Sequence, residues 1–346
     1  MRTTRAGGAF TIIGENIHAT RTVLRTGRHV ATSPGGREAI RFETPEGDRY
    51  LTIPEVLLGS GDFAAGKVKH VQAALLAILS GSEPDSSDGR AYIETLARRQ
   101  TAAGADFIDL NVDEVAQDTS TQQAAMRLLV QIIEALGAVP PSLDSSSAAV
   151  IGAGLEASRD PRRLLLNSAS VERLDVLDIA ASAGCAVVAS AAGESGLPSG
   201  VEDRLANGER IVELALARGV ALEAVHVDPL VLPVAVDPEA GAQFLEAVSR
   251  IRAALGPRVH ITGGLSNVSF GLPGRRLLND VFIDLAVEAG ADSGIVDPVA
   301  NDMSRVFGRD PFSRPYRLAA EMLAGTDPYG VEFITAFRAG ELAGDV

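Results

Sequence analysis

The chain has 346 residues, of which 46% are hydrophobic, so it can bury a large core. A total of 31 Lys and Arg against 45 Asp and Glu gives a formal charge of −14, which disfavours nucleic acid and anionic membranes as partners. No apolar run approaches the ~20 residues that span a bilayer, and a single cysteine excludes a disulfide framework. We therefore expect a soluble cytoplasmic protein with an aliphatic α/β interior.

Apolar segments of strand length alternate with amphipathic segments of helix length along most of the chain. The predicted strands cover 11–15, 105–111, 139–144, 164–167, 185–190, 225–228, 259–263 and 293–297. The predicted helices cover 91–103, 121–136, 148–157, 171–183, 201–218, 238–255 and 274–289, with further helices in 302–346. This alternation predicts a single (β/α)8 barrel over residues 1–346. An open doubly wound sheet is the weaker alternative, because no Gly-x-Gly-x-x-Gly turn follows the first strand.

A long segment, residues 19–89, interrupts the alternation after the first strand. It is far longer than the usual loop between a strand and a helix. Short strands are expected at 28–32, 38–43 and 49–53, followed by a helix at 66–79 and a flexible acidic connector at 80–89. The insertion leaves the barrel at the carboxyl end of the first strand. A lid, a docking surface and an oligomer contact are equally compatible with that position.

The stretch HITGGLSNVSFGLPGRR, residues 260–276, predicts a strand, a Gly-rich turn and a helix. Gly264 leaves room for close approach of a ligand or another backbone, while Ser266 and Asn267 offer donors and acceptors without charge. Local capping by Asn267 is the bland alternative.

Polar residues close nearly every predicted strand. In a barrel, strand ends share one mouth, so these side chains are expected to converge. Capping of the following helix explains any single one of them, but not so many. We expect a polar pocket formed by Glu15, Asn111 with Asp109 two residues before it, Asp144, Asn167, Ser190, Asp228, Asn267 and Asp297.

Several kinds of active site are disfavoured because the sequence lacks their motifs. The five histidines are scattered, which predicts no metal site, and only His18 is a candidate mouth contact. Neither a Gly-x-Ser-x-Gly elbow nor a phosphate-binding Walker A loop occurs. Carboxylates and amides suit a flat heterocycle with several N–H groups, because a carboxylate can accept two parallel N–H bonds.

Six segments, taken together, resemble the ordered motifs of the pterin-binding methyltransferase family. They are IIGE (12–15), GADFIDLNV (104–112), SLDSS (142–146), LLNSAS (165–170), VDPLVLPV (227–234) and GLSNVSFG (264–271). The family includes methyltetrahydrofolate:corrinoid/iron–sulfur protein methyltransferases and the folate-binding module of cobalamin-dependent methionine synthase. The resemblance implies a barrel of one-carbon metabolism that uses tetrahydrofolate or 5-methyltetrahydrofolate and a corrinoid (cobalamin) carried by a partner protein. It leaves the direction of methyl transfer open, and we expect a homodimer.

The resemblance also implies roles for individual residues. Asp144, Asn167 and Asp228 would hydrogen-bond the pterin ring, and Asn267 would contact N5 and act as the catalytic residue. A carboxamide can follow the change in charge at N5, because it can donate or accept. The remaining expected contacts are Asp109, Asn111, Gly264 and Ser266 in the pterin site, and Glu15, His18, Ser146, Ser190 and Asp297 around it.

Three features depart from the family pattern. Ser146 or Ser147 stands where the family commonly has Asn, the loop at 189–200 lacks a Met-Asn pair, and the 19–89 insertion is unlike the short connection of small members. Two alternatives therefore stay open. One is an enzyme like dihydropteroate synthase, although the cations that such an enzyme places after strands 7 and 8 are missing. The other is a non-catalytic folate-binding subunit.

Overall fold

The computed structural model describes residues 2–4, 7–137, 139–194 and 196–344. Eight strands follow one another as predicted: β2 (Ala9–His18), β8 (Phe107–Asn111), β9 (Pro141–Asp144), β10 (Leu165–Ala169), β11 (Ala186–Ser190), β12 (Val225–Asp228), β13 (His260–Ile261) and β14 (Ser293–Val296). Their order in the sheet follows the chain from β2 to β13, and β14 pairs with β2. The pairs β8–β9, β11–β12, β12–β13 and β14–β2 are parallel. This is the strand order of a (β/α)8 barrel, so the predicted fold class is confirmed.

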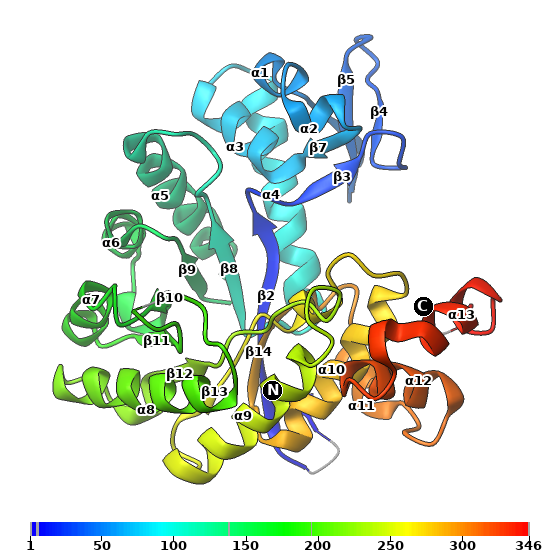
Figure 1. Ribbon diagram of the computed structural model, residues 1–346. Helices are drawn as coiled ribbons and strands as arrows, with labels where there is room; N and C mark the ends of the chain where they lie inside the picture. Colours follow the sequence, from blue (N-terminus) through cyan, green and yellow to red (C-terminus); the bar gives the residue numbers. More distant parts are fainter. Residues whose placement is uncertain (1, 5–6, 138, 195, 345–346) are drawn as a thin grey trace. The chain divides into compact units, whose positions relative to one another are not determined.

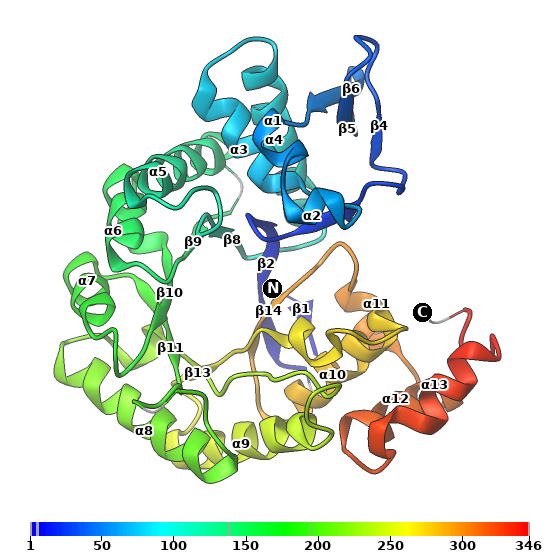
Figure 2. The same cartoon turned by 45° about the horizontal axis from the view of Figure 1, so that its top comes forward.

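Helices separate these strands (Figure 1): α4 (Asp85–Ala102), α5 (Thr119–Leu136), α6 (Ala148–Ala157), α7 (Asp175–Ala183), α8 (Val201–Ala217), α9 (Ala240–Leu255) and α10 (Arg275–Ala289). Short 3-10 turns complete the connections: η1 (Pro161–Arg163), η2 (Leu222–Ala224), η3 (Leu265–Ser269) and η4 (Pro328–Gly330). Figure 2 shows α8 and α9 side by side, as does Figure 1. Among the described residues, no helix combines the length and the apolar character needed to cross a membrane.

The chain divides into two compact units. Unit 1 comprises Met1–Gly14, Ala103–Asp106 and Leu166–Val346, and unit 2 comprises Glu15–Ala102 and Phe107–Leu165. In unit 1, the short strand β1 (Arg2–Thr3) runs antiparallel to β2. Its core includes Phe244 and Phe282, whose ring centroids lie 5.4 Å apart. In unit 2, helix α5 begins at the N-cap Asp118, which accepts a bond from the Thr121 N–H, and buries Met126, Leu129 and Ile133.

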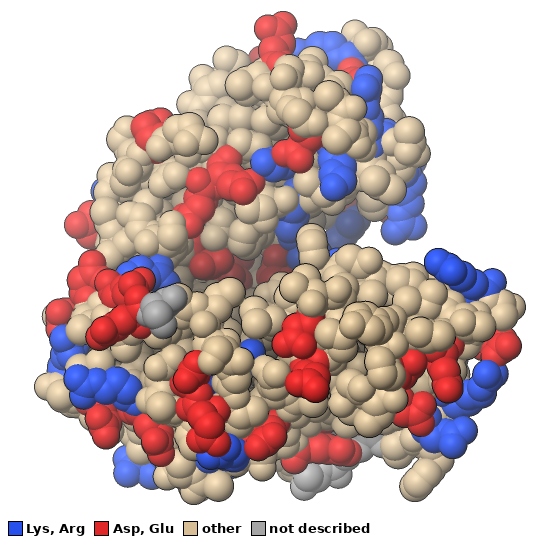
Figure 3. Space-filling view, in the orientation of Figure 1, with Lys and Arg blue, Asp and Glu red and all other residues tan. Residues whose placement is uncertain are grey.

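The insertion belongs to unit 2 and has its own small sheets. Strands β4 (Val30–Thr32), β5 (Glu38–Thr44) and β6 (Gly47–Thr52) form an antiparallel sheet, and β3 (Thr22–Leu24) pairs with β7 (Lys67–Lys69). The helices are α1 (Glu55–Leu58), α2 (Gly61–Ala64) and α3 (His70–Ser80). The three expected strands are therefore present. The expected helix at 66–79 begins only at His70, because Lys67–Lys69 form strand β7, which pairs with β3. Figure 3 shows Asp and Glu distributed over the visible surface, in keeping with the net charge of −14.

The expected flexible connector at 80–89 is partly wrong, because α4 already begins at Asp85. Acidic side chains in a first helical turn are stabilised by the helix dipole, and Asp85 and Asp88 occupy that turn. The insertion packs onto this helix through Phe42, whose ring meets Tyr92 edge-on at 5.1 Å. Tyr92 also bonds the buried His70 at 2.9 Å, so α4 belongs to the core of the insertion.

The C-terminal helices α11 (Met303–Gly308), α12 (Arg314–Leu323) and α13 (Val331–Arg338) follow β14. Their anchor is Asp280 of α10, which is fully buried and accepts bonds from Arg305, Arg309 and Asn301. A buried carboxylate needs such partners, because an unpaired charge in the interior is costly.

Candidate functional site

Unit 2 contributes an amide, a carboxylate and an imidazole at neighbouring strand ends. Asn111 ends β8 and Asp144 ends β9, and the two are partners in the parallel register. The Asn111 Nδ2 donates to Asp144 Oδ2 at 2.9 Å, and His18 Nε2 lies 3.5 Å from the same oxygen. His18 is the last residue of β2. Three elements thus hold one half-buried carboxylate in place.

Backbone N–H groups fix the orientation of these side chains. The Asp113 N–H donates to Asn111 Oδ1 at 3.1 Å, so the Asn111 amide nitrogen must face Asp144. The Thr20 N–H lies 3.3 Å from His18 Nδ1 and donates to it, which puts the ring proton on Nε2, toward Asp144. The Asp144 carboxylate is therefore already partly solvated by protein donors.

Another side-chain bond joins β8 to β9 two positions before Asn111 and Asp144. Asp109 is 3% exposed and accepts a 2.5 Å bond from the buried Ser142 hydroxyl. Asp109 precedes Asn111 by two positions, which puts both side chains on the same face of β8. Beyond β9, the exposed Ser146 donates its N–H to Asp113 at 2.8 Å, which ties the following turn to the strand ends.

Glu15 and Asn167 do not stand at strand ends, as had been expected from the sequence. Strand β2 continues to His18 and β10 continues to Ala169, so both residues lie inside their strands. Glu15 accepts from Arg21 Nη1 at 3.3 Å. Asn167 is half-buried and is joined to Ser168 by a cis peptide bond.

Unit 1 contributes a second carboxylate at the end of β12. Asp228 is paired in register with Ser190, the last residue of β11. Its Oδ1 accepts the Leu230 N–H at 2.8 Å, and among the described residues no hydrogen bond to its other oxygen is present. Leu230 has φ +70, a left-handed conformation that costs a non-glycine residue about 1 kcal/mol. The N–H of a residue in a left-handed conformation thus orients this carboxylate.

Burial raises the pKa of Asp228 to about 6, although the Leu230 N–H and the positive charge of Arg204 both act to lower it. Arg204 of α8 is fully buried and was not among the residues selected from the sequence. The carboxylate therefore changes its charge within the range of pH in which proteins are commonly assayed.

The turn after β13 carries Gly264, Ser266 and Asn267. Asn267 is exposed and lies in η3 rather than at the end of a strand, because β13 stops at Ile261. A Cβ at position 264 would come within 2.7 Å of the Asn267 Nδ2. Gly264 therefore provides the space that the Asn267 carboxamide occupies. Ser266 is 6% exposed, and its hydroxyl has no hydrogen-bond partner among the described residues.

Arg275, at the start of α10, holds this turn and was also missed in the sequence. Its Nη2 donates to the Ser266 carbonyl at 2.9 Å, and its Nε donates to the Ser269 hydroxyl at 3.0 Å. Ser269 in turn bonds Asn279 of α10 at 2.6 Å. The Arg275 guanidinium therefore stabilises the conformation of the turn. After β14, Asp297 accepts the Val299 and Ala300 N–H groups, which is the capping role that the sequence left open.

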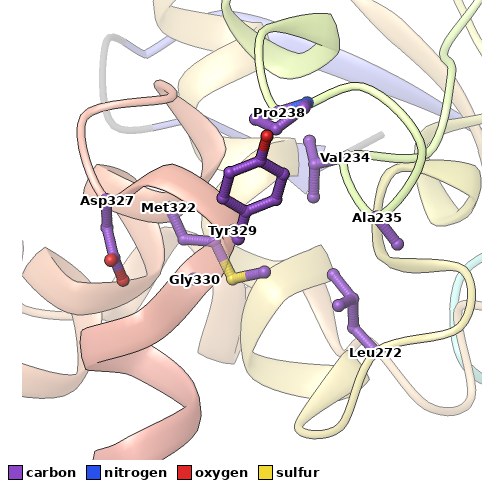
Figure 4. A pocket seen from close by; sticks show the side chains of 8 residues that line it. All are labelled: Val234, Ala235, Pro238, Leu272, Met322, Asp327, Tyr329 and Gly330. Atoms are coloured by element: carbon purple, nitrogen blue, oxygen red, sulfur yellow. The ribbon is translucent and has the colours of Figure 1, made fainter.

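Three cavities of the structure are formed by other residues. One of about 220 Å³ is lined by Tyr329 and Met322 and, from the loop after β12, by Val234, Ala235 and Pro238 (Figure 4). Its one carboxylate, Asp327, accepts the backbone N–H groups of Glu332 and Phe333. Others of about 260 and 480 Å³ flank α4 and the start of α8. None of these three cavities is lined by a predicted site residue. Among the described residues, no cluster of three or more His, Cys, Asp or Glu could hold a metal ion.

Residues 87–297, more than half of the chain, match the model of a family described as pterin binding enzyme. The chain belongs to this family. The six sequence motifs predicted a pterin-binding family. The family match and the strand order confirm that prediction.

Particular relatives narrow the comparison. The chain is 29% identical over 259 residues to the methylcorrinoid:tetrahydrofolate methyltransferase of Eubacterium limosum, an alignment that covers 73% of this chain and 89% of the relative. It is 30% identical over 286 residues to the methionine synthase of Mycobacterium leprae, covering 77% of this chain but only 22% of that protein. The solved dihydropteroate synthase of Xanthomonas albilineans with 7,8-dihydropteroate has a TM-score of 0.51 at 18% identity, covering 65% and 86% of the two chains. The last likeness concerns the fold alone.

Proposed function

We propose that this protein is a methyltransferase that moves a methyl group between N5 of tetrahydrofolate and the cobalt of a corrinoid. Membership of the pterin binding enzyme family supports the pterin, and the similarity to a methylcorrinoid:tetrahydrofolate methyltransferase supports the corrinoid. The proposal covers both directions, because forward and reverse transfer share one transition state.

The observation that carries the proposal is the pair of oriented carboxylates, Asp144 and Asp228. Each ends a strand and is fixed by neighbouring donors, and neither is held in an ion pair with a Lys or Arg side chain among the described residues. A half-buried carboxylate with an accessible oxygen matches the two N–H groups of an aminopyrimidinone ring. We assign pterin binding to Asp144, Asn167 and Asp228, with Asp109 and Asn111 beneath the ring. The outer contacts would be Glu15, His18, Ser146, Ser190 and Asp297.

Asn267 would act at N5. A tertiary amine is a poor leaving group, so N5 must gain positive charge or a proton before the methyl group departs. The exposed Asn267 carboxamide can accept from a protonated N5 or donate to a neutral one, which lets it follow the reaction. The unpartnered Ser266 hydroxyl offers a further polar contact in the same turn. The corrinoid, when bound, supplies the nucleophilic or electrophilic cobalt.

The synthase alternative has less support. Its chemistry releases pyrophosphate and needs a cation near the turn after β13. Arg275, one of two arginines that follow this turn, is already bonded to the Ser266 carbonyl and the Ser269 hydroxyl. The turn itself offers an amide and hydroxyl groups, which suit N5 of a folate better than a pyrophosphate.

The corrinoid would be delivered by a corrinoid-binding protein in the cytoplasm. We assign the 19–89 insertion to contact with that protein or with a second copy in a homodimer.

The test is a methyl-transfer assay with purified protein. 5-Methyltetrahydrofolate and cob(I)alamin are mixed with the enzyme, and loss of the cob(I)alamin absorbance is followed. Protein-dependent loss of the signal supports the proposal. Binding of the folate without transfer favours a non-catalytic subunit, whereas condensation of a pterin pyrophosphate with p-aminobenzoate favours the synthase.

A further inference from the structure

The turn η3 in unit 1 exposes a carboxamide and a phenyl ring while it buries its hydroxyl groups. Asn267 is exposed, and Phe270, the C-cap of the turn, is 65% exposed. The buried residues of the turn are Leu265, Ser266, Val268 and Ser269. The Ser266 hydroxyl lacks a hydrogen-bond partner among the described residues. Burial of such a hydroxyl and exposure of a phenyl ring both oppose stability, so this arrangement is better explained by a ligand.

The two exposed side chains lie on the same side of the turn. The Phe270 N–H donates to the Asn267 carbonyl at 3.0 Å, and the φ of −59 at Phe270 is still helical. In a 3-10 helix, side chains three residues apart lie nearly above one another, with an axial rise of about 6 Å between them. The phenyl ring is therefore displayed next to the carboxamide that we propose to act at N5.

The turn that carries the phenyl ring is held in a defined position. The Arg275 guanidinium lies 5.9 Å from the centroid of the Phe270 ring, which is within the range of a cation–π contact. The same guanidinium donates to the Ser266 carbonyl, and the Val268 carbonyl accepts the Val234 N–H at 3.0 Å. The ring is thus supported by Arg275 and remains open to solvent over most of its surface.

The chemistry of a folate places a second aromatic ring close to N5. Its p-aminobenzoyl group is joined through a methylene group to C6, the ring atom next to N5. Four bonds separate N5 from the benzoyl ring, a span of at most about 5 Å. A folate whose N5 meets Asn267 therefore carries its benzoyl ring to the neighbourhood of Phe270. Aromatic pairs attract at centroid separations of roughly 4.5–7 Å, which suits this spacing.

We propose that Phe270 binds the p-aminobenzoyl ring of the folate and so selects folates over pterins that lack this ring. The inference rests on the proposed function, because it takes N5 to lie at Asn267. Phe270 is thus a specificity-determining residue and takes no part in the chemistry at N5.

The test compares the wild type with Phe270→Ala by anaerobic calorimetric titration of two ligands. Tetrahydropteroate carries the pterin and the p-aminobenzoyl ring without glutamate, and 6-methyltetrahydropterin carries the pterin alone. Phe270→Ala should weaken binding of tetrahydropteroate by about tenfold, because an aromatic contact and its buried area are lost. Binding of 6-methyltetrahydropterin should change by less than about twofold. Phe270→Tyr keeps the ring and should retain the wild-type affinity for both ligands.

A matched control and the remaining outcomes make the test decisive. Phe312→Ala removes another phenylalanine of unit 1, which is 84% exposed, and should leave both affinities unchanged. An equal loss for both ligands in Phe270→Ala, or no loss for either, would overturn the inference. A raised KM for cob(I)alamin with unchanged affinity for tetrahydropteroate would also overturn it, because the ring would then face the corrinoid. If the wild type binds neither ligand, the proposed function fails instead.

Discussion

The two carboxylates proposed to bind the pterin are supported in different ways. In unit 2, Asp144 is held by side chains, with the Asn111 amide at 2.9 Å and the His18 ring at 3.5 Å. In unit 1, Asp228 is held by one backbone N–H, that of Leu230, and is influenced by the buried charge of Arg204. The Asn267 carboxamide also belongs to unit 1 and owes its space to Gly264.

The comparison distinguishes a carboxylate that is fixed in position from one whose charge depends on pH. A carboxylate surrounded by side-chain donors is rigid and tolerates the loss of one partner. A buried carboxylate that is held by a single backbone donor has a raised pKa, so its charge depends on pH. We infer that the proposed role of Asp144 depends on its fixed position, whereas the proposed role of Asp228 depends on its charge. Substitutions in the two units should therefore have different signatures.

Asn267→Ala should give the largest effect. Loss of the carboxamide removes the group that follows the charge at N5, and we expect a decrease in kcat of about 300-fold. The dissociation constant of 5-methyltetrahydrofolate should change by less than about threefold, because the contact matters mainly in the transition state. Single-turnover kinetics and calorimetry on the same preparation separate the two quantities. If Asn267→Ala weakened folate binding but left kcat unchanged, the proposed role of Asn267 in the reaction would be contradicted.

Asp228→Asn should weaken folate binding by about 100-fold at pH 7.5, because charge-assisted hydrogen bonds are lost. Burial raises the pKa of Asp228 to about 6, so wild-type affinity should fall about tenfold per pH unit below that value. The ionised form accepts the pterin N–H groups, and the proton competes with them. The Asn variant carries no charge and should lose this part of the pH dependence. Retention of the full wild-type pH profile would show that another group titrates.

Gly264→Ala tests the turn after β13. The added methyl group would lie 2.7 Å from Asn267 Nδ2, so the carboxamide must move. Displacement of a flexible side-chain end is cheap in stability but displaces the reacting contact, and we expect kcat to fall about tenfold with little change in melting temperature. A large loss of stability would mean that Gly264 serves the fold instead.

His18→Ala should have the smallest effect. Asn111 still donates to Asp144 in this variant, and a half-exposed pairing contributes little, so folate affinity should fall by about threefold at most. Asn111→Ala is the matched comparison, because it removes the shorter bond and should cost more. Equal losses from both variants would contradict the shared support of Asp144.

The sequence predicted the fold because short, mostly apolar strand segments alternate with longer segments whose apolar residues recur every three or four positions. The helix at Ala148–Ala157 and the strand at Val225–Asp228 were predicted with their observed bounds. The start of α4 was missed because Asp85 and Asp88 were interpreted as part of a solvated connector. The same acidic residues favour a helix N-terminus, so the signal was present but ambiguous.

The candidate site could be predicted only in part. Polar residues at strand ends identified Asn111, Asp144 and Asp228, since strand parity determines where they point. Arg204 had a signal that went unused, because its spacing from Gly208, Ile211 and Ala215 puts it on the buried face of α8. The left-handed conformation of Leu230 and the hydrogen bond from Arg275 to the Ser266 carbonyl depend on tertiary structure. No local sequence pattern predicts them.

The central claim is that Asp228 binds the pteridine of a folate and that Asn267, in the same unit, acts at N5. A crystal structure of the protein with 5-methyltetrahydrofolate tests it directly. We predict that the Asp228 carboxylate accepts hydrogen bonds from the pyrimidinone ring and that the Asn267 carboxamide lies within hydrogen-bonding distance of N5. A folate bound away from Asp228, or with N5 remote from Asn267, would contradict the claim.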